Sequence, residues 1–293
     1  MQIKALNILE NSVIDEIRTA EELCRKHDNH AGSISLDLTF NFKQDLKSVF
    51  LLYDQNKLIS VLSIFAPTRQ EAEITAFTIP TYRENGCFKM LFEEAVAEIM
   101  RCGIKEILFV CEPASLSGQA VLKKLNARYD FTEYSMKYIE PPLTPVAKSS
   151  TREILIEANA ENIEEIVVLR EKVFGDCHDD ALAIVGNTFG SDKRKQYVFS
   201  LSGQNVGIVS VFVEDTEASI HGFGIIPKYR GKGLGKEMLL QITKNLISEG
   251  YKDIIIEVDS KNQAAFELYK KCGFKVAISY DYFRYNIMAS QGF

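Results

Sequence analysis

A short glycine-rich loop in the C-terminal half of the chain carries residue types that bind phosphate. It reads Arg230-Gly231-Lys232-Gly233-Leu234-Gly235, and Lys236 follows directly. An apolar, strand-like segment ends just before it, and an amphipathic helix is expected to begin inside it. The N-terminus of a helix offers unpaired N–H groups and partial positive charge, and glycines let the backbone approach an anion closely. The loop therefore predicts a pyrophosphate site.

The loop departs from two common phosphate-binding motifs. A Walker A loop would need glycine where Arg230 stands and Ser or Thr where Glu237 stands. The dinucleotide fingerprint G-x-G-x-x-G is also absent, because the glycines lie at 231, 233 and 235. Composition alone is explained equally well by a glycine-rich turn that merely caps a helix.

A second segment, residues 262–274, makes the interpretation more specific. It reads Asn262-Gln263-Ala264-Ala265-Phe266-Glu267-Leu268-Tyr269-Lys270-Lys271-Cys272-Gly273-Phe274. The first loop resembles the (Q/R)-x-x-G-x-(G/A) signature of the GNAT superfamily of N-acetyltransferases. The second segment is similar to that family's second motif, which has an Asn, an Ala pair, a Leu-Tyr and a Gly-Phe. The clear resemblance covers about residues 152–287, and a fainter one covers about residues 47–138.

The resemblance implies that acetyl-CoA is the co-substrate. In the family, the first motif binds the pyrophosphate, and the pantetheine arm lies between two parallel strands that separate. On this chain those strands would be residues 219–225 and 254–258. The expected cofactor-binding residues are Ile225, Ile226, Arg230, Gly231, Lys232, Gly233, Leu234, Gly235, Lys236 and Asn262.

The resemblance also implies direct transfer, in which an amine attacks the thioester carbonyl and coenzyme A thiolate leaves. This chemistry needs an oxyanion donor, an acceptor for the amine proton and a donor for the thiolate. The backbone N–H of Ile225 is the expected oxyanion donor. Tyr269 stands where the family often has its general acid, and a phenol with a reference pKa of about 10 is protonated at neutral pH.

The general base has several candidates. His221 lies on the strand entering the site, at a position where some family members carry a catalytic histidine, and a reference pKa of about 6.5 suits the role. Glu257 and Asp259 compete with it, and they share one face of the next strand because successive strand residues alternate. A water chain without any base is the remaining alternative. Cys177 and His178 form no second ligand pair, so we expect a polar loop and no metal.

The spacing of apolar residues and the positions of glycine and proline predict the elements that position these residues. Apolar residues recur at helical spacing from Ile163 to Val173, and a hairpin is expected over 197–213 with its turn at 202–205. A third strand over 218–226, a helix from 234 to Gly250, a strand over 253–258, a helix over 264–271 and a last strand over 280–287 follow. The fold class is α+β: a mixed, mostly antiparallel sheet flanked by helices.

The chain also repeats itself. Residues 79–86 resemble residues 226–233, and residues 103–107 resemble residues 250–254, both at a shift of 147. The first copy is degenerate: Glu84, Phe88 and Leu122 stand where the second copy has Gly231, Gly235 and Tyr269. At the same shift Ile74 falls on His221. We therefore expect two tandem GNAT-like domains with one active site, in the second.

Length and composition set the remaining limits. The 293 residues suit two domains, here 1–140 and 151–293, joined by a proline-rich linker over 141–150. A formal net charge of −6 argues against broad nucleic-acid binding. Six scattered cysteines and no apolar run of about 20 residues indicate a cytoplasmic protein that does not bind membranes. The expected acceptor is a small amine or a peptide amine.

Two other functions compete with acetyl transfer from acetyl-CoA. A non-catalytic acyl-CoA sensor or scaffold would keep the binding motifs without turnover, and the degenerate first copy shows that such loss has occurred in this chain. A transferase of a longer acyl group would share both motifs, because neither one reports the volume of the thioester pocket.

Overall fold

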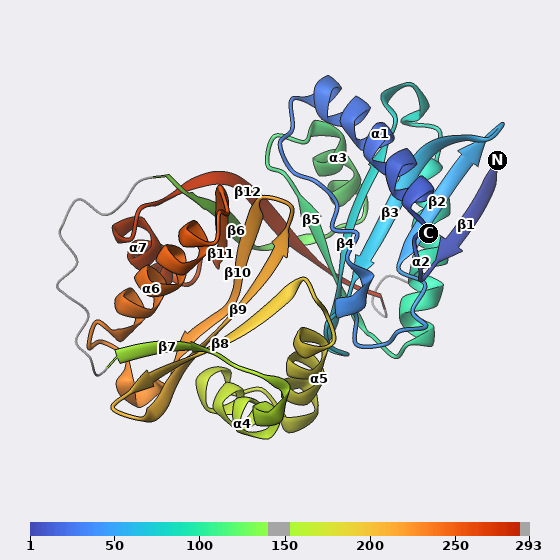
Figure 1. Cartoon of the computed structure of the whole chain (residues 1–293). Coiled ribbons are helices and arrows are strands. Elements are labelled where there is room, and N and C mark those ends of the chain that lie inside the picture. Colours follow the sequence, from blue (N-terminus) through green and yellow to red (C-terminus); the bar gives the residue numbers. More distant parts are fainter. Residues whose placement is uncertain (140–152, 288–293) are drawn as a thin grey trace. The chain divides into compact units, whose positions relative to one another are not determined.

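The computed structural model describes residues 1–139 and 153–287, and its contacts divide the chain into two compact units (Figure 1). The N-terminal unit consists of Met1–Thr132 and Ser279–Phe293, and the C-terminal unit is Glu133–Ile278. Each unit contains a mixed sheet with one parallel pair of strands, with helices against both faces.

In the described part of the N-terminal unit, the sheet has six strands in the order β1-β2-β3-β4-β5-β12. They are β1 (Gln2–Leu6), β2 (Val49–Asp54), β3 (Lys57–Phe65), β4 (Glu71–Thr78), β5 (Glu106–Cys111) and the end of β12 (Phe274–Asn286). Helix α1 (Asn11–Asp28) packs on one face with Leu51 and Val61. Helices α2 (Cys87–Arg101) and α3 (Leu116–Lys124) pack on the other face, with Leu52 and Ile59.

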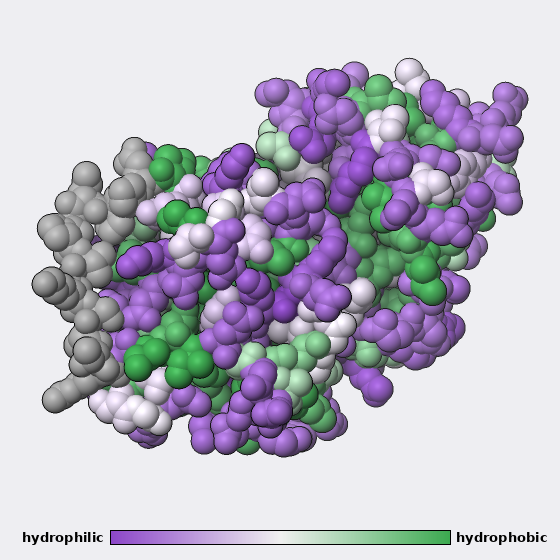
Figure 2. Space-filling view, in the orientation of Figure 1, coloured by the Kyte–Doolittle hydropathy of each residue, from purple (hydrophilic) through white to green (hydrophobic). Residues whose placement is uncertain are grey.

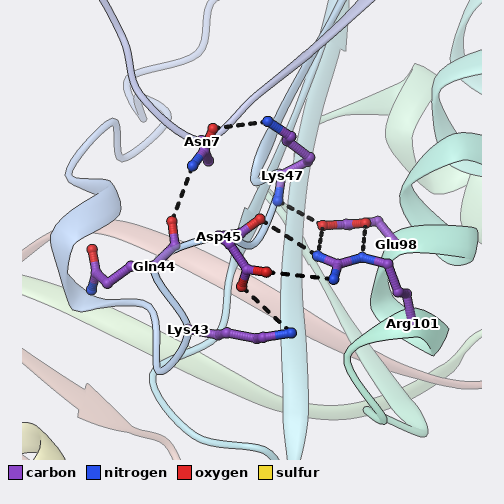
Figure 3. A network of polar contacts seen from close by, with 7 residues as sticks. All are labelled: Asn7, Lys43, Gln44, Asp45, Lys47, Glu98 and Arg101. Atoms are coloured by element: carbon purple, nitrogen blue, oxygen red, sulfur yellow. Dashed lines mark hydrogen bonds and ion pairs between the residues drawn. The ribbon is translucent and has the colours of Figure 1, made fainter.

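A polar network fastens the segment before β2 to the end of α2 (Figure 3). Arg101 places two nitrogens on Glu98 and a third 3.6 Å from Asp45. Glu98 also accepts the backbone N–H of Lys47 at 2.7 Å. This network holds the chain where it enters the central strands of the unit.

The C-terminal unit repeats the arrangement with strand order β6-β11-β10-β9-β8-β7. Its strands are β6 (Arg128–Tyr138), β7 (Glu153–Glu157), β8 (Arg194–Leu201), β9 (Gln204–Glu214), β10 (Glu217–Ile225) and β11 (Asp253–Asp259). Helices α6 (Leu234–Ser248) and α7 (Gln263–Lys271) cover one face, here called the α6 face, with Ile220 and Ile256. Helices α4 (Ile163–Phe174) and α5 (His178–Phe189) cover Val198 and Ile208 on the opposite face, here called the α4 face.

The internal repeat is visible in the element bounds. The short 3₁₀ helices Pro80–Tyr82 and Pro227–Tyr229 lie 147 residues apart, and so do α2 and α6, and α3 and α7. The predicted α+β fold with two similar halves is confirmed. Most predicted elements of the second half also appear, including the β8–β9 hairpin and the end of α4 at Gly175.

The last strand of each repeat belongs to the sheet of the other compact unit. Strand β6 follows α3, yet its residues 133–137 pair with β11. Strand β12 follows α7, yet its residues 281–286 pair with β5. The compact units therefore do not follow the expected bounds 1–140 and 151–293, and the expected linker over 141–150 lies outside the described residues.

Two helices were not expected from the sequence. Helix α1 precedes the region of clear self-similarity, and α5 begins at His178, where a polar loop was expected. His178, Asp179 and Asp180 form the first turn of α5, where acidic side chains favour the positive end of the helix dipole.

Strand β7 lies at the edge of its sheet with exposed apolar side chains. Ile154 and Ile156 are about half exposed, and Figure 2 shows apolar surface over this strand. Within the described residues, every helix falls short of the length or apolar content needed to cross a membrane.

Candidate active site

The centre of the candidate site is the place where β10 and β11 stop pairing. Their parallel register runs from Glu217 opposite Asp253 to Ile220 opposite Ile256. Both strands continue beyond that point, β10 to Ile225 and β11 to Asp259. Beyond Ile220 and Ile256, the N–H and C=O groups on the facing edges of β10 and β11 no longer pair with each other. An extended ligand inserted between the two strands could form hydrogen bonds with them.

A β-bulge in β10 lies directly after this point. His221 pairs with Ser210 of β9 and Gly224 pairs with Ile208, so β10 contains one extra residue there. Gly222, inside the bulge, has a φ of +51°, and a Cβ there would lie 3.3 Å from the Arg170 guanidinium. Bulges of this kind often re-aim backbone and side chains beside active sites.

Strand β4, the counterpart of β10, has no such bulge, and this changes the alignment of the two repeats. Strand β4 pairs with β3 without a shift, and its parallel pairing with β5 ends at Ile74 opposite Phe109. Ile74 therefore corresponds to Ile220, and the counterpart of His221 is Thr75. The prediction that Ile74 replaces His221 was wrong by one residue, because a uniform shift of 147 ignores the extra residue in β10.

The backbone of Ile225 is oriented as an oxyanion donor would be. The next amide, that of Ile226, donates to the Val206 carbonyl of β9 at 2.9 Å. Because successive amides of a strand point to opposite sides, the Ile225 N–H points away from β9, toward the gap beside β11. The Ile226 carbonyl accepts from the Tyr229 N–H and its side chain is buried, so both backbone groups of Ile226 are paired within the protein.

The loop before α6 presents its backbone to solvent. Gly231 and Gly233 have φ values of +73° and +83°, and a Cβ at either position would meet nothing within 4 Å. The helical hydrogen bonds begin with Glu237 N–H to the Gly233 carbonyl, so the amides ahead of Glu237 have no acceptor within the helix. This is the geometry of an anion site.

The side chains of the loop differ in whether a ligand could contact them. The Lys232 ammonium lies 5.4 Å from the Tyr229 ring, and Lys236 is half-buried in the first turn of α6. Leu234 is buried in the core, so only its backbone can contact a ligand. A Cβ at Gly235 would lie 3.4 Å from Leu268, so a small residue there lets α6 and α7 pack closely.

Arg230 supports the site through hydrogen bonds to backbone carbonyls. Its Nε donates to the Ile225 carbonyl at 2.8 Å and a terminal nitrogen donates to the Val173 carbonyl at 2.9 Å. In the N-terminal unit, Arg83 donates in the same way to the Thr78 carbonyl, five residues earlier, at 3.0 Å. The side chain thus joins the end of β10 to the end of α4, a structural role that the loop motif alone did not reveal.

Tyr269 reaches the bulge from α7. Its ring packs edge-on against Phe223 with centroids 5.9 Å apart, and its side chain is buried. Burial, with a smaller contribution from Cys272, raises the pKa of Tyr269, so the phenol stays protonated at neutral pH. Asn262 caps α7 by accepting the Ala265 N–H, so its carbonyl oxygen has a structural partner.

Cys272 lies near Tyr269 on the α6 face. Burial raises the pKa of its thiol to about 11, which leaves little thiolate at neutral pH. An acyl-cysteine intermediate at this position is therefore disfavoured, in agreement with direct transfer.

The candidate bases lie on the α4 face of the same sheet. Ile220 and Ile256 point into the α6 core, so His221 and Glu257, one residue further along adjacent strands, point to the α4 face. Both residues expose surface to solvent, and the protein around them still desolvates their charged forms. Desolvation, and secondly the charge of Arg194, lower the pKa of His221 to about 4. Desolvation, followed by the charges of Glu133 and Glu217, raises the pKa of Glu257 to about 7.

Asp259 shares that face but has a local partner. Its carboxylate accepts the backbone N–H of Lys261 at 2.7 Å and the Ser260 hydroxyl at 3.4 Å. These contacts are those of an Asx turn at the end of β11. Of the two acidic candidates, Asp259 is therefore the one with a structural role.

The corresponding region of the N-terminal unit is filled by its own side chains. The Phe88 ring stacks on Phe92 at 5.5 Å and lies 6.5 Å from Phe109, where the parallel pairing ends. Glu112, just beyond β5, accepts the Gly32 N–H at 2.7 Å. The chain before β2 is therefore tied down beside the strands that would have to admit a ligand.

No group of three or more potential ligand residues within the described residues is arranged to hold a metal ion. His178 pairs instead with Glu171 at 2.8 Å, and this carboxylate raises the pKa of the imidazole. Cys177 is an exposed free thiol ahead of α5.

Residues 161–274 match the family model described as Acetyltransferase (GNAT) family, a segment that contains both sequence motifs. The C-terminal half of the chain is a GNAT-family acetyltransferase. The family uses acyl-CoA and acetylates amines, and the predicted enzyme class is confirmed.

Solved structures extend the similarity in fold to the whole chain. A GCN5-related N-acetyltransferase from Sphaerobacter thermophilus superposes with a TM-score of 0.75 at 15% identity, covering 98% of this chain and 95% of that one. A tandem GNAT protein from the clavulanic acid biosynthesis pathway gives 0.72 at 11% identity, covering 97% and 98%. A GNAT acetyltransferase from Colwellia psychrerythraea gives 0.62 at 17%, covering 98% and 100%. The tandem GNAT fold therefore covers both halves.

Proposed function

We propose that the protein transfers an acetyl group from acetyl-CoA to a primary amine, by direct attack, at one active site in the C-terminal unit. The observation that carries this proposal is the bulge in β10 at the end of the β10–β11 pairing. It lies beside the exposed loop before α6, and its counterpart in the N-terminal unit has neither bulge nor open space. The N-terminal unit is accordingly proposed not to bind acyl-CoA.

The amides and lysines of the loop would hold the pyrophosphate, which places the thioester in the gap between β10 and β11. The acceptor nitrogen would attack the carbonyl carbon, with the Ile225 N–H donating to the oxyanion. As the C–N bond forms and the C–S bond breaks, Tyr269 would give its proton to the departing sulfur. The general acid and the general base would therefore lie on opposite faces of the sheet, the acid on the α6 face and the base on the α4 face.

Glu257 suits the role of base better than His221. An efficient base has a pKa near the working pH, and that of Glu257 lies at about 7 whereas that of His221 lies at about 4. Glu257 would take the proton that the amine loses, directly or through one water. His221 would be neutral at pH 7, so it would serve as a hydrogen-bonding neighbour.

A coenzyme A release assay over a panel of primary amines tests the function. Tyr269→Phe should lower kcat by about 10²-fold, the usual contribution of a general acid.

Lys236→Ala should raise the KM for acetyl-CoA about fivefold, because one charge near the phosphates is lost. Tyr285→Phe and Lys89→Ala are matched controls: both lie in the N-terminal unit, and Lys89 is the repeat counterpart of Lys236. Both should act like wild type.

Two outcomes would argue against the assignment. Full activity in both Tyr269→Phe and Lys236→Ala would exclude this site. Calorimetric binding of acetyl-CoA without turnover on any amine would favour the non-catalytic sensor. A preference for a longer acyl-CoA over acetyl-CoA in the same assay would identify a different acyl donor.

A further inference from the structure

One acidic residue beside the proposed base comes from the other repeat. Glu133 lies on β6, the strand that follows α3 of the first repeat and pairs with β11. Opposite Glu257 on β6 stands Ser135, and opposite Asp259 stands Glu133. Sequence comparison does not link Glu133 to the second active site, because 124 residues separate it from Glu257 and it precedes the expected linker.

Glu133 and Glu257 share the α4 face. On β6, Tyr134 packs against Phe266 of α7 and Met136 is buried in the α6 core, so the odd-numbered residues point to the opposite face. Diagonal neighbours on adjacent antiparallel strands lie about 7–8 Å apart at Cα, within reach of long side chains. Two carboxylates at that spacing repel each other, and this favours the protonated form of the more desolvated one.

Other charged groups lie on the same face, including Arg194 of β8, whose charge lowers the pKa of His221, and Arg170 of α4, beside Gly222. Lys137 of β6, the nearest cation on the strand, binds Asp253 at 2.6 Å, so it is directed away from Glu257. The titratable and charged groups that face Glu257 from its own and the neighbouring strands are Asp253 and Asp259 on β11, Glu133 and Lys137 on β6, and Glu217 and His221 on β10.

We propose that Glu133, supplied by the first repeat through strand β6, is a positioning residue for Glu257 in acetyl transfer. Its like charge, diagonally across from Glu257 on the neighbouring strand, favours the form of Glu257 that exchanges a proton near neutral pH. This inference rests on the proposed function. It gives the first repeat a role in the chemistry of the second, although the first repeat has lost its own site.

The pH dependence of kcat/KM tests this role. In wild type, activity should rise with pH through an apparent pKa near 7, as Glu257 loses its proton. In Glu133→Gln the like charge is gone, so the pKa of Glu257 falls and the acidic limb should move about one unit toward lower pH. Glu133→Asp should restore most of this shift.

Controls separate this inference from the proposed function and from a folding defect. Glu267→Gln removes an exposed carboxylate from α7 and should leave the profile unchanged. Glu257→Gln should abolish the acidic limb altogether. An unshifted profile in Glu133→Gln, at wild-type thermal stability, would overturn the inference while leaving the acetyltransferase assignment intact. A wild-type protein that releases no coenzyme A with any amine would overturn both.

Discussion

At the level of single residues, the site depends on a glycine as much as on residues with long side chains. Gly224 ends the bulge, and a Cβ there would lie 2.3 Å from Val173 and 2.9 Å from Phe174 of α4. Arg230 ties the same segments together through the Ile225 and Val173 carbonyls. Arg230, a motif residue, and Gly224, which lies outside any motif, therefore both determine how α4 packs against the end of β10.

Gly224→Ala should destabilise the protein by about 1–3 kcal/mol, because the added methyl forces α4 away from β10. Activity should fall with it, since the bulge would move. Gly186→Ala is the matched control: Gly186 lies inside α5, and a Cβ there meets nothing within 4 Å. Alanine in a helix interior should stabilise it by about 0.5–1 kcal/mol. Thermal melts of both variants would show whether the two changes have opposite signs, as this packing requires.

At the scale of elements, the two repeats keep the same framework with different connections. In the N-terminal unit, Arg83 holds the end of β4 and also makes a two-pronged ion pair with Asp28 at the end of α1, at 2.8 and 2.5 Å. Arg230 reaches the Val173 carbonyl near the end of α4 instead. Each arginine links the end of its strand to the end of an earlier helix, α1 in one unit and α4 in the other, so the strand–loop–helix unit is supported in both copies.

Asp28→Asn should lower the stability at pH 7 by about 1–3 kcal/mol, the value of a charged hydrogen bond. The hydrogen bonds from Arg83 lower the pKa of Asp28 from 3.8 to about 2. This contribution is therefore present above about pH 4 and is lost as the pH falls toward 2. Urea unfolding of wild type and variant at pH 7 and pH 2.5 should show the difference shrinking at the lower pH. An equal difference at both values would mean that Asp28 acts without its charge.

At the scale of the whole molecule, each repeat completes the sheet of the other compact unit. Residues 133–137 pair with β11, and Met136 is fully buried in the core beneath α6 and α7. Residues 281–286 pair with β5, and Tyr285 is buried in the core of the N-terminal unit. A division of the chain at residues 141–150 would remove one core strand from each unit.

Fragments test this organisation. Residues 133–278 should fold and give a cooperative thermal transition by circular dichroism. Residues 151–278 lack β6, so they leave the edge of β11 unpaired and lose Met136 from the core, and they should aggregate or remain unfolded. Equal melting of the two fragments would show that β6 contributes nothing to the C-terminal unit.

Much of this protein was determined by local sequence. Apolar spacing, proline and glycine placed most strands and helices of the second repeat, and the motifs at 230–235 and 262–274 identified the family that the comparison found. Local signals suffice there because helix starts, turns and anion-binding loops are made by residues close together in the chain.

Which distant residues lie close together depends on the tertiary structure. The strand pairing makes Thr75 the counterpart of His221. A bulge is defined by the register of two strands, so a uniform shift along one sequence does not reveal it. The tertiary structure gave Arg230 a structural role, since its carbonyl partners lie 5 and 57 residues away. It placed Glu133 diagonally across from Glu257 on the neighbouring strand, because strand order depends on how whole elements pack. The loop from Arg230 to Gly235 identifies the chemistry, and the pairing of distant strands determines which side chains can take part in it.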